Sequence, residues 1–108
     1  MRSFSVLPMK SKISTLSDTV LNQAADVLKV MAHPVRLKIV NVLMQGEFTV
    51  GKIADLTGAS PSQTCAHLRL LQTHNLLSSE RRGHVVYYRI ASPCLPGLIE
   101  CIGRTCGK

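Results

Sequence analysis

Apolar residues recur at three- and four-residue intervals along the first half of the chain, which is the spacing of one face of an α-helix. Ser17 can cap a first helix over residues 17–33, and Pro34 suits the first position of a second helix over 34–45, which Gly46 terminates. The apolar face of the first helix comprises Leu21, Ala24, Ala25, Leu28 and Met31. That of the second comprises Val35, Leu37, Ile39, Val40, Leu43 and Met44.

Two shorter helices follow in close succession. Thr49 can cap a helix that Gly58 ends, and the next helix starts again at Ser60 with Pro61 in its first turn. Ser60 and Gln63 have the S-x-x-Q spacing of a capping box. Two helices joined by a short turn, the second capped and polar on one side, are typical of a helix-turn-helix.

After Asn75 the period of the pattern changes from that of a helix to that of a strand. A short strand from Leu76 or Leu77 to Glu80, a turn of sequence RRGH and the run 85–88 (VVYY) predict a two-stranded hairpin with a basic tip. The stripe of the last segment predicts a final helix, weakened by Pro96, Gly97 and Gly103; it is formed by Leu95, Leu98, Ile99 and Ile102. We therefore predict a mainly α winged helix-turn-helix, with about five helices and a two-stranded wing.

Composition supports this fold class and suggests a partner. The 108 residues are enough for one domain, and 45% are hydrophobic although only 4% are aromatic, which favours an aliphatic helical core. Thirteen Lys and Arg against six Asp and Glu give a net charge of +7. Such an excess attracts polyanions, so nucleic acid is the expected partner.

The N-terminal region predicts neither export nor membrane insertion. Residues 1–16 are basic, their apolar run is short and interrupted by Pro8, and we expect a flexible arm before a domain over 17–108. No stretch of the chain reaches the roughly 18 apolar residues of a membrane span. We therefore expect a cytoplasmic protein with no membrane partner, in which the four cysteines stay reduced.

Three local strings resemble the signatures of the ArsR/SmtB family of small bacterial winged-helix repressors. AHPVRLKIVNVL (32–43) is similar to the family's second helix, SPSQTCAHLRLLQ (60–72) to its recognition helix and RRGHVVYYRI (81–90) to its wing. The resemblance implies a homodimer that represses transcription from double-stranded operator DNA. It also implies release by an inducer, often a metal ion or metalloid and in some branches an oxidant or reactive sulfur species, that binds or modifies cysteines.

The recognition helix and the wing supply the candidate DNA-contacting residues. A buried stripe of Thr64, Leu68 and Leu71 would turn small polar side chains outward, where Gln63 can pair with adenine and Arg69 can meet phosphate. The candidates are Ser60, Ser62, Gln63, Thr64, Cys65, Ala66, His67 and Arg69 of the helix, with Arg81, Arg82 and His84 of the wing. Alternatively, His67 is a half-buried packing residue, His84 only completes the turn, and the wing arginines are merely solvated.

The cysteines are the candidate sensing groups. In the similar family, one metal site uses a Cys-x-Cys pair where this chain has Thr49 and Gly51, and a second uses Asp and His on the last helices, where this chain has no histidine after His84. What remains are three thiols, which suit a thiophilic ion or metalloid such as arsenite: Cys94, Cys101 and Cys106. The alternative is that they pack as small hydrophobes.

Spacing limits how these thiols can act together. Cys94 and Cys101 are about 10.5 Å apart along a straight helix, too far for a disulfide, so a shared ligand or bond needs local fraying or a second subunit. A helix N-terminus at Cys94 would favour a reactive thiolate. Cys65 is instead expected to be a small groove-flanking residue, although direct oxidation there would block DNA entry.

We therefore predict a homodimeric repressor that needs no cofactor or small-molecule substrate to bind DNA and is released by an inducer acting on the C-terminal cysteines. The alternatives are a non-sensing DNA-binding or adaptor protein of the same fold and a small thiol enzyme. The enzyme would need a Cys-x-x-Cys pair or a phosphate-cradling loop beside its nucleophile, and the chain has neither.

Overall fold

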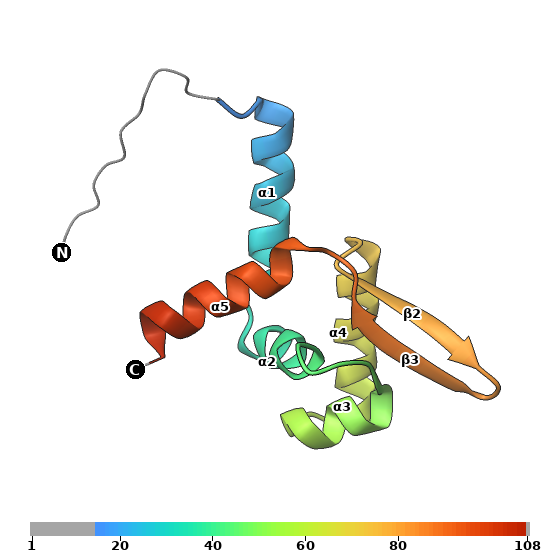
Figure 1. The fold of residues 1–108 in the computed structure, drawn as a ribbon. Coiled ribbons are helices and arrows are strands. Elements are labelled where there is room, and N and C mark those ends of the chain that lie inside the picture. Colours follow the sequence, from blue (N-terminus) through green and yellow to red (C-terminus); the bar gives the residue numbers. More distant parts are fainter. Residues whose placement is uncertain (1–14, 108) are drawn as a thin grey trace.

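Five helices and three strands make up the protein in a computed structural model, which describes residues 15–107 (Figure 1). The predicted arm at residues 1–16 lies almost entirely outside the described residues. In chain order the elements are α1 (Asp18–Met31), α2 (Pro34–Leu43), β1 (Phe48–Thr49), α3 (Val50–Thr57), α4 (Pro61–Thr73), β2 (Leu77–Arg82), β3 (Val85–Ile90) and α5 (Cys94–Cys106). The predicted fold class is confirmed.

Local capping explains where the helices begin. The Ser17 and Thr49 hydroxyls each accept a hydrogen bond from the backbone amide three residues on, both at 3.2 Å. Ser60 and Gln63 form the predicted capping box at the start of α4. At the start of α2, Nδ1 of His33 accepts from the amide of Val35 at 3.2 Å, so a residue expected only to end α1 also caps the following helix.

The β-structure is a three-stranded antiparallel sheet of order β1-β3-β2, in which β2 and β3 form the predicted hairpin and β1 is a strand that the sequence did not predict. β1 pairs with β3 through Phe48 opposite Tyr88 and Thr49 opposite Tyr87. A two-residue strand is too short to show the alternation of a strand in the sequence. It forms only because its partner residues, far along the chain, lie beside it. At the hairpin turn Gly83 adopts a φ of +65°, which favours glycine.

The core is aliphatic and joins α2, α3, α4 and α5. The predicted stripe of α4 is buried, with Leu68 and Leu71 at 0% exposure, and Leu95 anchors the start of α5 in the same cluster at 0%. α5 runs unbroken through Pro96, Gly97 and Gly103, contrary to the weak helix expected. Pro96 lies in the first helical turn, where a backbone amide has no intrahelical carbonyl to donate to, so the N–H that proline lacks costs no helix hydrogen bond.

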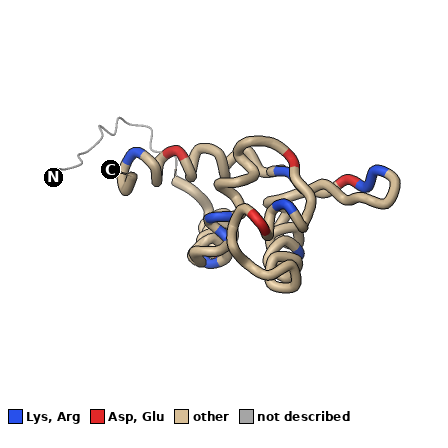
Figure 2. Tube along the Cα trace, turned by 90° about the horizontal axis from the view of Figure 1, so that it is seen from below, with Lys and Arg blue, Asp and Glu red and all other residues tan. Residues whose placement is uncertain are grey.

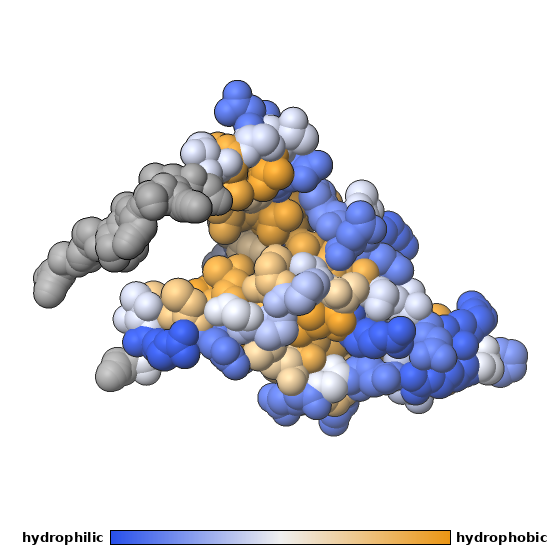
Figure 3. Space-filling view, turned by 45° about the horizontal axis from the view of Figure 1, so that its top comes forward, coloured by the Kyte–Doolittle hydropathy of each residue, from blue (hydrophilic) through white to orange (hydrophobic). Residues whose placement is uncertain are grey.

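α1 is far less buried than its apolar pattern suggests. Of the predicted face only Met31 is buried in this chain, whereas Leu21 and Leu28 remain 48% and 58% exposed. Figure 1 shows the reason, since only the last turn of α1 reaches the body of the molecule. Apolar side chains gather on the surface of this helix in Figure 3. We call the exposed group the α1 face: Leu16, Val20, Leu21 and Leu28.

Candidate nucleic-acid interface

α4 presents a small, polar surface away from the core. Ser62, Gln63, Ala66 and Arg69 are exposed, as the sequence predicts for a helix that enters the major groove. Thr64 was also among the candidate DNA contacts, and that assignment is wrong, because its side chain is fully buried and its hydroxyl has no hydrogen-bond partner among the described residues. Thr64 follows the exposed Gln63 in sequence but lies in line with Leu68 on the buried side of α4, so its position in the chain suggested a DNA contact while the helical period correctly predicted burial.

The capping box limits what two of the candidates can do. The Ser60 hydroxyl accepts from the Gln63 amide at 3.1 Å, and the Ser60 amide donates to Oε1 of Gln63 at a long 3.5 Å. Ser60 is therefore engaged in holding the first turn of α4. Gln63 must give up only the weaker of these bonds to offer an adenine both a donor and an acceptor.

Cys65 and Arg69 lie one turn apart on the flank of α4. Nη2 of Arg69 is 4.0 Å from Sγ of Cys65, and the thiol is half-buried while the arginine is exposed. The guanidinium thus has a weak neutral partner and stays available for a phosphate. That Cys65 flanks the DNA groove stays a prediction.

His67 faces the protein rather than the outer surface of α4. Its Nδ1 accepts a hydrogen bond from Nε of Arg36 at 3.2 Å, and its ring centre is 4.8 Å from that of His33. Burial lowers the pKa of His67, with smaller contributions from the charges of Arg36 and His33. The geometry therefore favours the packing alternative for His67 over a contact with bases.

This lowered pKa predicts acid sensitivity of the fold. An unfolded histidine titrates near 6.5, so the contribution of neutral His67 to stability is complete above that pH. It is lost as pH falls below 6.5 and through the lower pKa of the folded state. Urea unfolding at pH 7.5 and 5.5 should show a smaller acid loss for His67→Asn than for the wild type. His74→Asn, at the end of α4, is the control and should keep the wild-type loss; equal losses in all three proteins would contradict this assignment.

The two wing arginines differ in their surroundings. Nη2 of Arg82 donates to Glu47 at 2.5 Å and to Glu80 at 2.9 Å, and its guanidinium lies 4.6 Å from the centre of the Tyr87 ring. The two carboxylates raise the pKa of Arg82, first through the hydrogen bond to Glu80, and Arg82 lowers the pKa of Glu80 in return. Arg82 thus joins the hairpin to the loop before β1, a role that the sequence did not suggest because Glu47 is 35 residues away.

Arg81 and His84 are the freer residues of the wing tip. Both are exposed and neither has a side-chain hydrogen bond or ion pair among residues 15–107. Figure 2 shows the basic positions near the far end of the hairpin, well away from the body of the protein. A side chain at that reach can meet the backbone of a DNA duplex whose major groove holds α4.

We expect Arg81→Gln to weaken binding to all DNA sequences and to reduce the salt slope of log affinity by about one unit, because one phosphate contact is lost. Lys29→Gln, which removes the same charge from an exposed site on α1 outside the α1 face, is the matched control and should not change the slope by a full unit. Fluorescence anisotropy between roughly 50 and 200 mM salt measures both. Identical slopes for Arg81→Gln and the wild type would remove this side chain from the interface.

The three C-terminal cysteines lie along α5, and none is buried in this chain. Cys94 is the first helical residue, and its Sγ is 3.1 Å from the hydroxyl of Ser92. Exposure argues against the packing alternative within a single chain. Among the described residues 15–107, no three His, Cys, Asp or Glu side chains lie together as a metal site would require.

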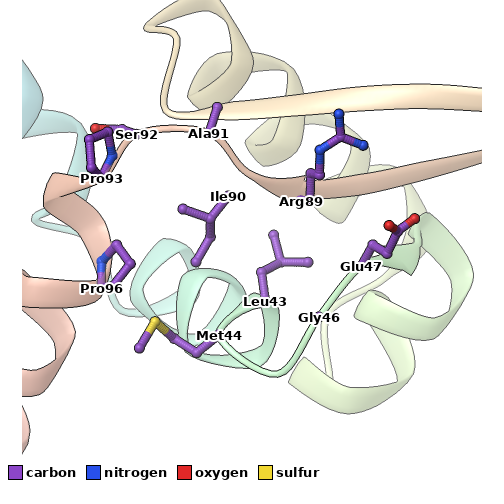
Figure 4. Close-up of a pocket in the computed structure, with 10 residues that line it drawn as sticks. All are labelled: Leu43, Met44, Gly46, Glu47, Arg89, Ile90, Ala91, Ser92, Pro93 and Pro96. Carbon is purple, nitrogen blue, oxygen red and sulfur yellow. The ribbon is translucent and has the colours of Figure 1, made fainter.

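A cavity of about 610 Å³ lies beside the start of α5, between the end of α2 and the end of β3 (Figure 4). Its surface is largely apolar, with Arg89 and Glu47 at one side and Ser92 at the other. No local sequence pattern points to this cavity, because its walls come from two segments far apart in the chain, 43–47 and 89–96. The lining is completed by Leu43, Met44, Gly46, Ile90, Ala91, Pro93 and Pro96.

A capped helix with a small polar outer surface, beside a basic β-hairpin, defines a winged helix-turn-helix DNA-binding protein. Residues 33–79 match the model of the bacterial regulatory protein, arsR family. The chain belongs to this family, as the resemblance of its three motifs implied. It is a transcriptional regulator and not an enzyme, which excludes the thiol-enzyme alternative.

Similar proteins span most of the chain. The nodulation protein NolR of Rhizobium meliloti is 39% identical over 78% of this chain and 69% of its own. The transcriptional repressor PagR of Bacillus anthracis is 35% identical over 76% and 83%. The homodimeric winged helix-turn-helix DNA-binding domain Mb0332 of Mycobacterium bovis, solved by NMR, has a TM-score of 0.75 at 33% identity and covers 88% of this chain and 91% of its own.

Among residues 15–107 no helix has the length and hydropathy to cross a membrane.

Proposed function

We propose that the protein is a cytoplasmic homodimeric repressor, released from its operator when an inducer acts on Cys94, Cys101 and Cys106. The observation that carries this proposal is the row of three exposed thiols on a helix whose first turn is anchored in the core. Soft thiolates favour a thiophilic ion or a metalloid such as arsenite, and exposed ones also react with oxidants and reactive sulfur species. Repression is supported by the similarity to PagR.

Dimerisation is supported by apolar surface that this chain leaves uncovered. The four residues of the α1 face are 44–58% exposed. A groove of about 340 Å³ between α2 and α5 adds Leu37, Ile99 and Ile102 to the uncovered apolar surface. Contiguous apolar surface of this kind marks an interaction site, and the similar Mb0332 domain is homodimeric. A two-fold axis would also place the thiols of two chains within one interface, where a shared ligand needs no fraying of α5.

A series of hydrogen bonds connects the first turn of α5 to the recognition helix. The Cys94 amide donates to the Ser92 hydroxyl at 3.4 Å, and the Ser92 amide donates to the Leu76 carbonyl at 3.2 Å. The Leu76 amide in turn donates to the carbonyl of Leu71 in α4 at 3.0 Å. A ligand or bond that moves the first turn of α5 would therefore displace the end of α4. A tenfold loss of operator affinity needs about 1.4 kcal/mol of such coupling.

The proposal is tested with DNA from upstream of the protein's own gene. Specific binding to that DNA is expected, followed by release on titration with at least one of arsenite, cadmium, zinc, peroxide and persulfide. Binding without release by any of them would favour a non-sensing regulator of the same fold. Absence of specific binding to any promoter fragment would favour an adaptor.

A further inference from the structure

Arg36 contacts two other helices from its place on α2. Its Nε donates to Nδ1 of His67 on α4 at 3.2 Å, and its Nη1 donates to the carbonyl of Val30 in the last turn of α1 at 3.1 Å. Both acceptors are neutral, and Arg36 has no carboxylate partner among the described residues. A half-buried guanidinium thus links the helix with the exposed apolar face to the helix that reads DNA.

His33 completes this junction between α1, α2 and α4. Its Nδ1 accepts the hydrogen bond from Val35 that caps α2, and the planes of the His33 and His67 rings meet at 56°. The three side chains come from the α1–α2 turn, from α2 and from α4, and they meet on the inner side of the recognition helix. We call His33, Arg36 and His67 the helix junction.

The hydrogen bond between Arg36 and His67 requires one protonation state. Nδ1 of His67 accepts from Arg36, so it must carry a lone pair, and the ring proton must be on Nε2. A proton on Nδ1 would remove the acceptor and place a second cation against Arg36. The charged groups that act on His67 are Arg36 of α2 and His33 of the α1–α2 turn; α3 and β2, the other elements packed against α4, contribute none.

We propose that Arg36 and His67 are positioning residues for operator binding: their hydrogen bond fixes α4 relative to α1, and protonation of His67 releases it. The inference rests on the proposed dimerisation through α1. In a symmetric dimer the two recognition helices must meet half-sites about 34 Å apart, so the angle between α4 and the dimer helix decides whether both can enter the groove. A residue that fixes this angle acts on DNA affinity without touching DNA.

The pH dependence of operator binding distinguishes this role from simple packing. Asparagine at position 67 offers an acceptor near the place of Nδ1 but does not titrate. Whatever the affinity of His67→Asn at pH 7.5, the ratio of wild-type to His67→Asn operator affinity should fall about tenfold between pH 7.5 and 5.5. Protonation of the other histidines also changes DNA affinity, but both proteins contain those histidines, so this contribution cancels in the ratio of their affinities. Anisotropy titrations at fixed ionic strength provide the measurement, with sedimentation confirming the same oligomeric state.

Arg36→Lys gives a second, independent readout, since an ammonium keeps the charge but lacks the planar fork that reaches two acceptors at once. We expect this variant to bind operator about tenfold more weakly at pH 7.5, whereas Lys29→Gln, at an exposed site on α1 outside the α1 face, stays within about twofold. If Arg36→Lys does not fold, the His67→Asn profile alone decides. Parallel pH profiles for wild type and His67→Asn would overturn the positioning role. If the wild type binds no operator DNA at any pH, the result would instead contradict the proposed function.

Discussion

Replacing Cys94, Cys101 and Cys106 together with serine is expected to abolish release by the inducer while operator affinity stays within about twofold of the wild type. All three thiols are exposed, so the substitutions remove no core contacts, and surface changes of this kind typically alter stability by less than about 0.5 kcal/mol. Serine is similar in size, but its hydroxyl does not ionise or bind soft ions as a thiolate does. The measurement is anisotropy of labelled operator during titration with the inducer that releases the wild type.

Cys65→Ser is the matched control for this experiment, because it removes the remaining thiol and leaves those of α5 in place. It should still be released by the inducer, whatever its starting affinity. Release of the triple variant at the wild-type inducer concentration would refute sensing by α5. Loss of release in Cys65→Ser alone would transfer the switch to the recognition helix.

Two aspartates on the α1 face, Leu21→Asp with Leu28→Asp, are expected to give a folded monomer with operator affinity reduced on the order of 100-fold. These side chains are 48% and 58% exposed in the single chain, so charging them costs the monomer little. In a dimer the same positions would be covered, and four buried carboxylates would oppose association. Losing the dimer loses the second half-site and the avidity that it provides.

Sedimentation velocity and anisotropy together check this prediction. The matched control is Thr19→Asp with Asn22→Asp, which adds the same charge to exposed polar positions on the other side of α1. That variant should remain dimeric and bind operator with an affinity much closer to that of the wild type. A dimeric double aspartate variant would show that α1 does not form the interface.

Local signals predicted most of the secondary structure. Ser17, Thr49 and Ser60 cap their helices as expected, because each cap joins residues only three positions apart. The buried stripe of α4 also follows from its period, and with it the outward placement of Ser62 and Arg69. The assignment of Thr64 to DNA contact was wrong because consecutive residues of a helix point in different directions, and Thr64 lies on the buried side with Leu68 and Leu71.

Long-range contacts account for what the pattern did not predict. β1 forms because Phe48 pairs with Tyr88, and Arg82 is held by Glu47, so both depend on segments about 35–40 residues apart. The link between Arg36 and His67 spans 31 residues and gives no signal in the hydrophobic pattern. The α1 face shows the opposite case, in which a clear amphipathic pattern has no packing partner in the described part of the chain, residues 15–107.

The sequence by itself therefore determined the order and type of the helices, the recognition helix and its outer face, the basic wing and the family. Capping, helical period and net charge are properties of neighbouring residues or of the whole composition, and they do not require a fold. Only the tertiary structure decided that Arg82 joins the wing to Glu47 while Arg81 has no side-chain partner among residues 15–107, that His67 faces Arg36, and that three thiols lie exposed along one anchored helix. Each of these depends on which distant side chains meet when the core closes, and packing of the whole chain sets that geometry.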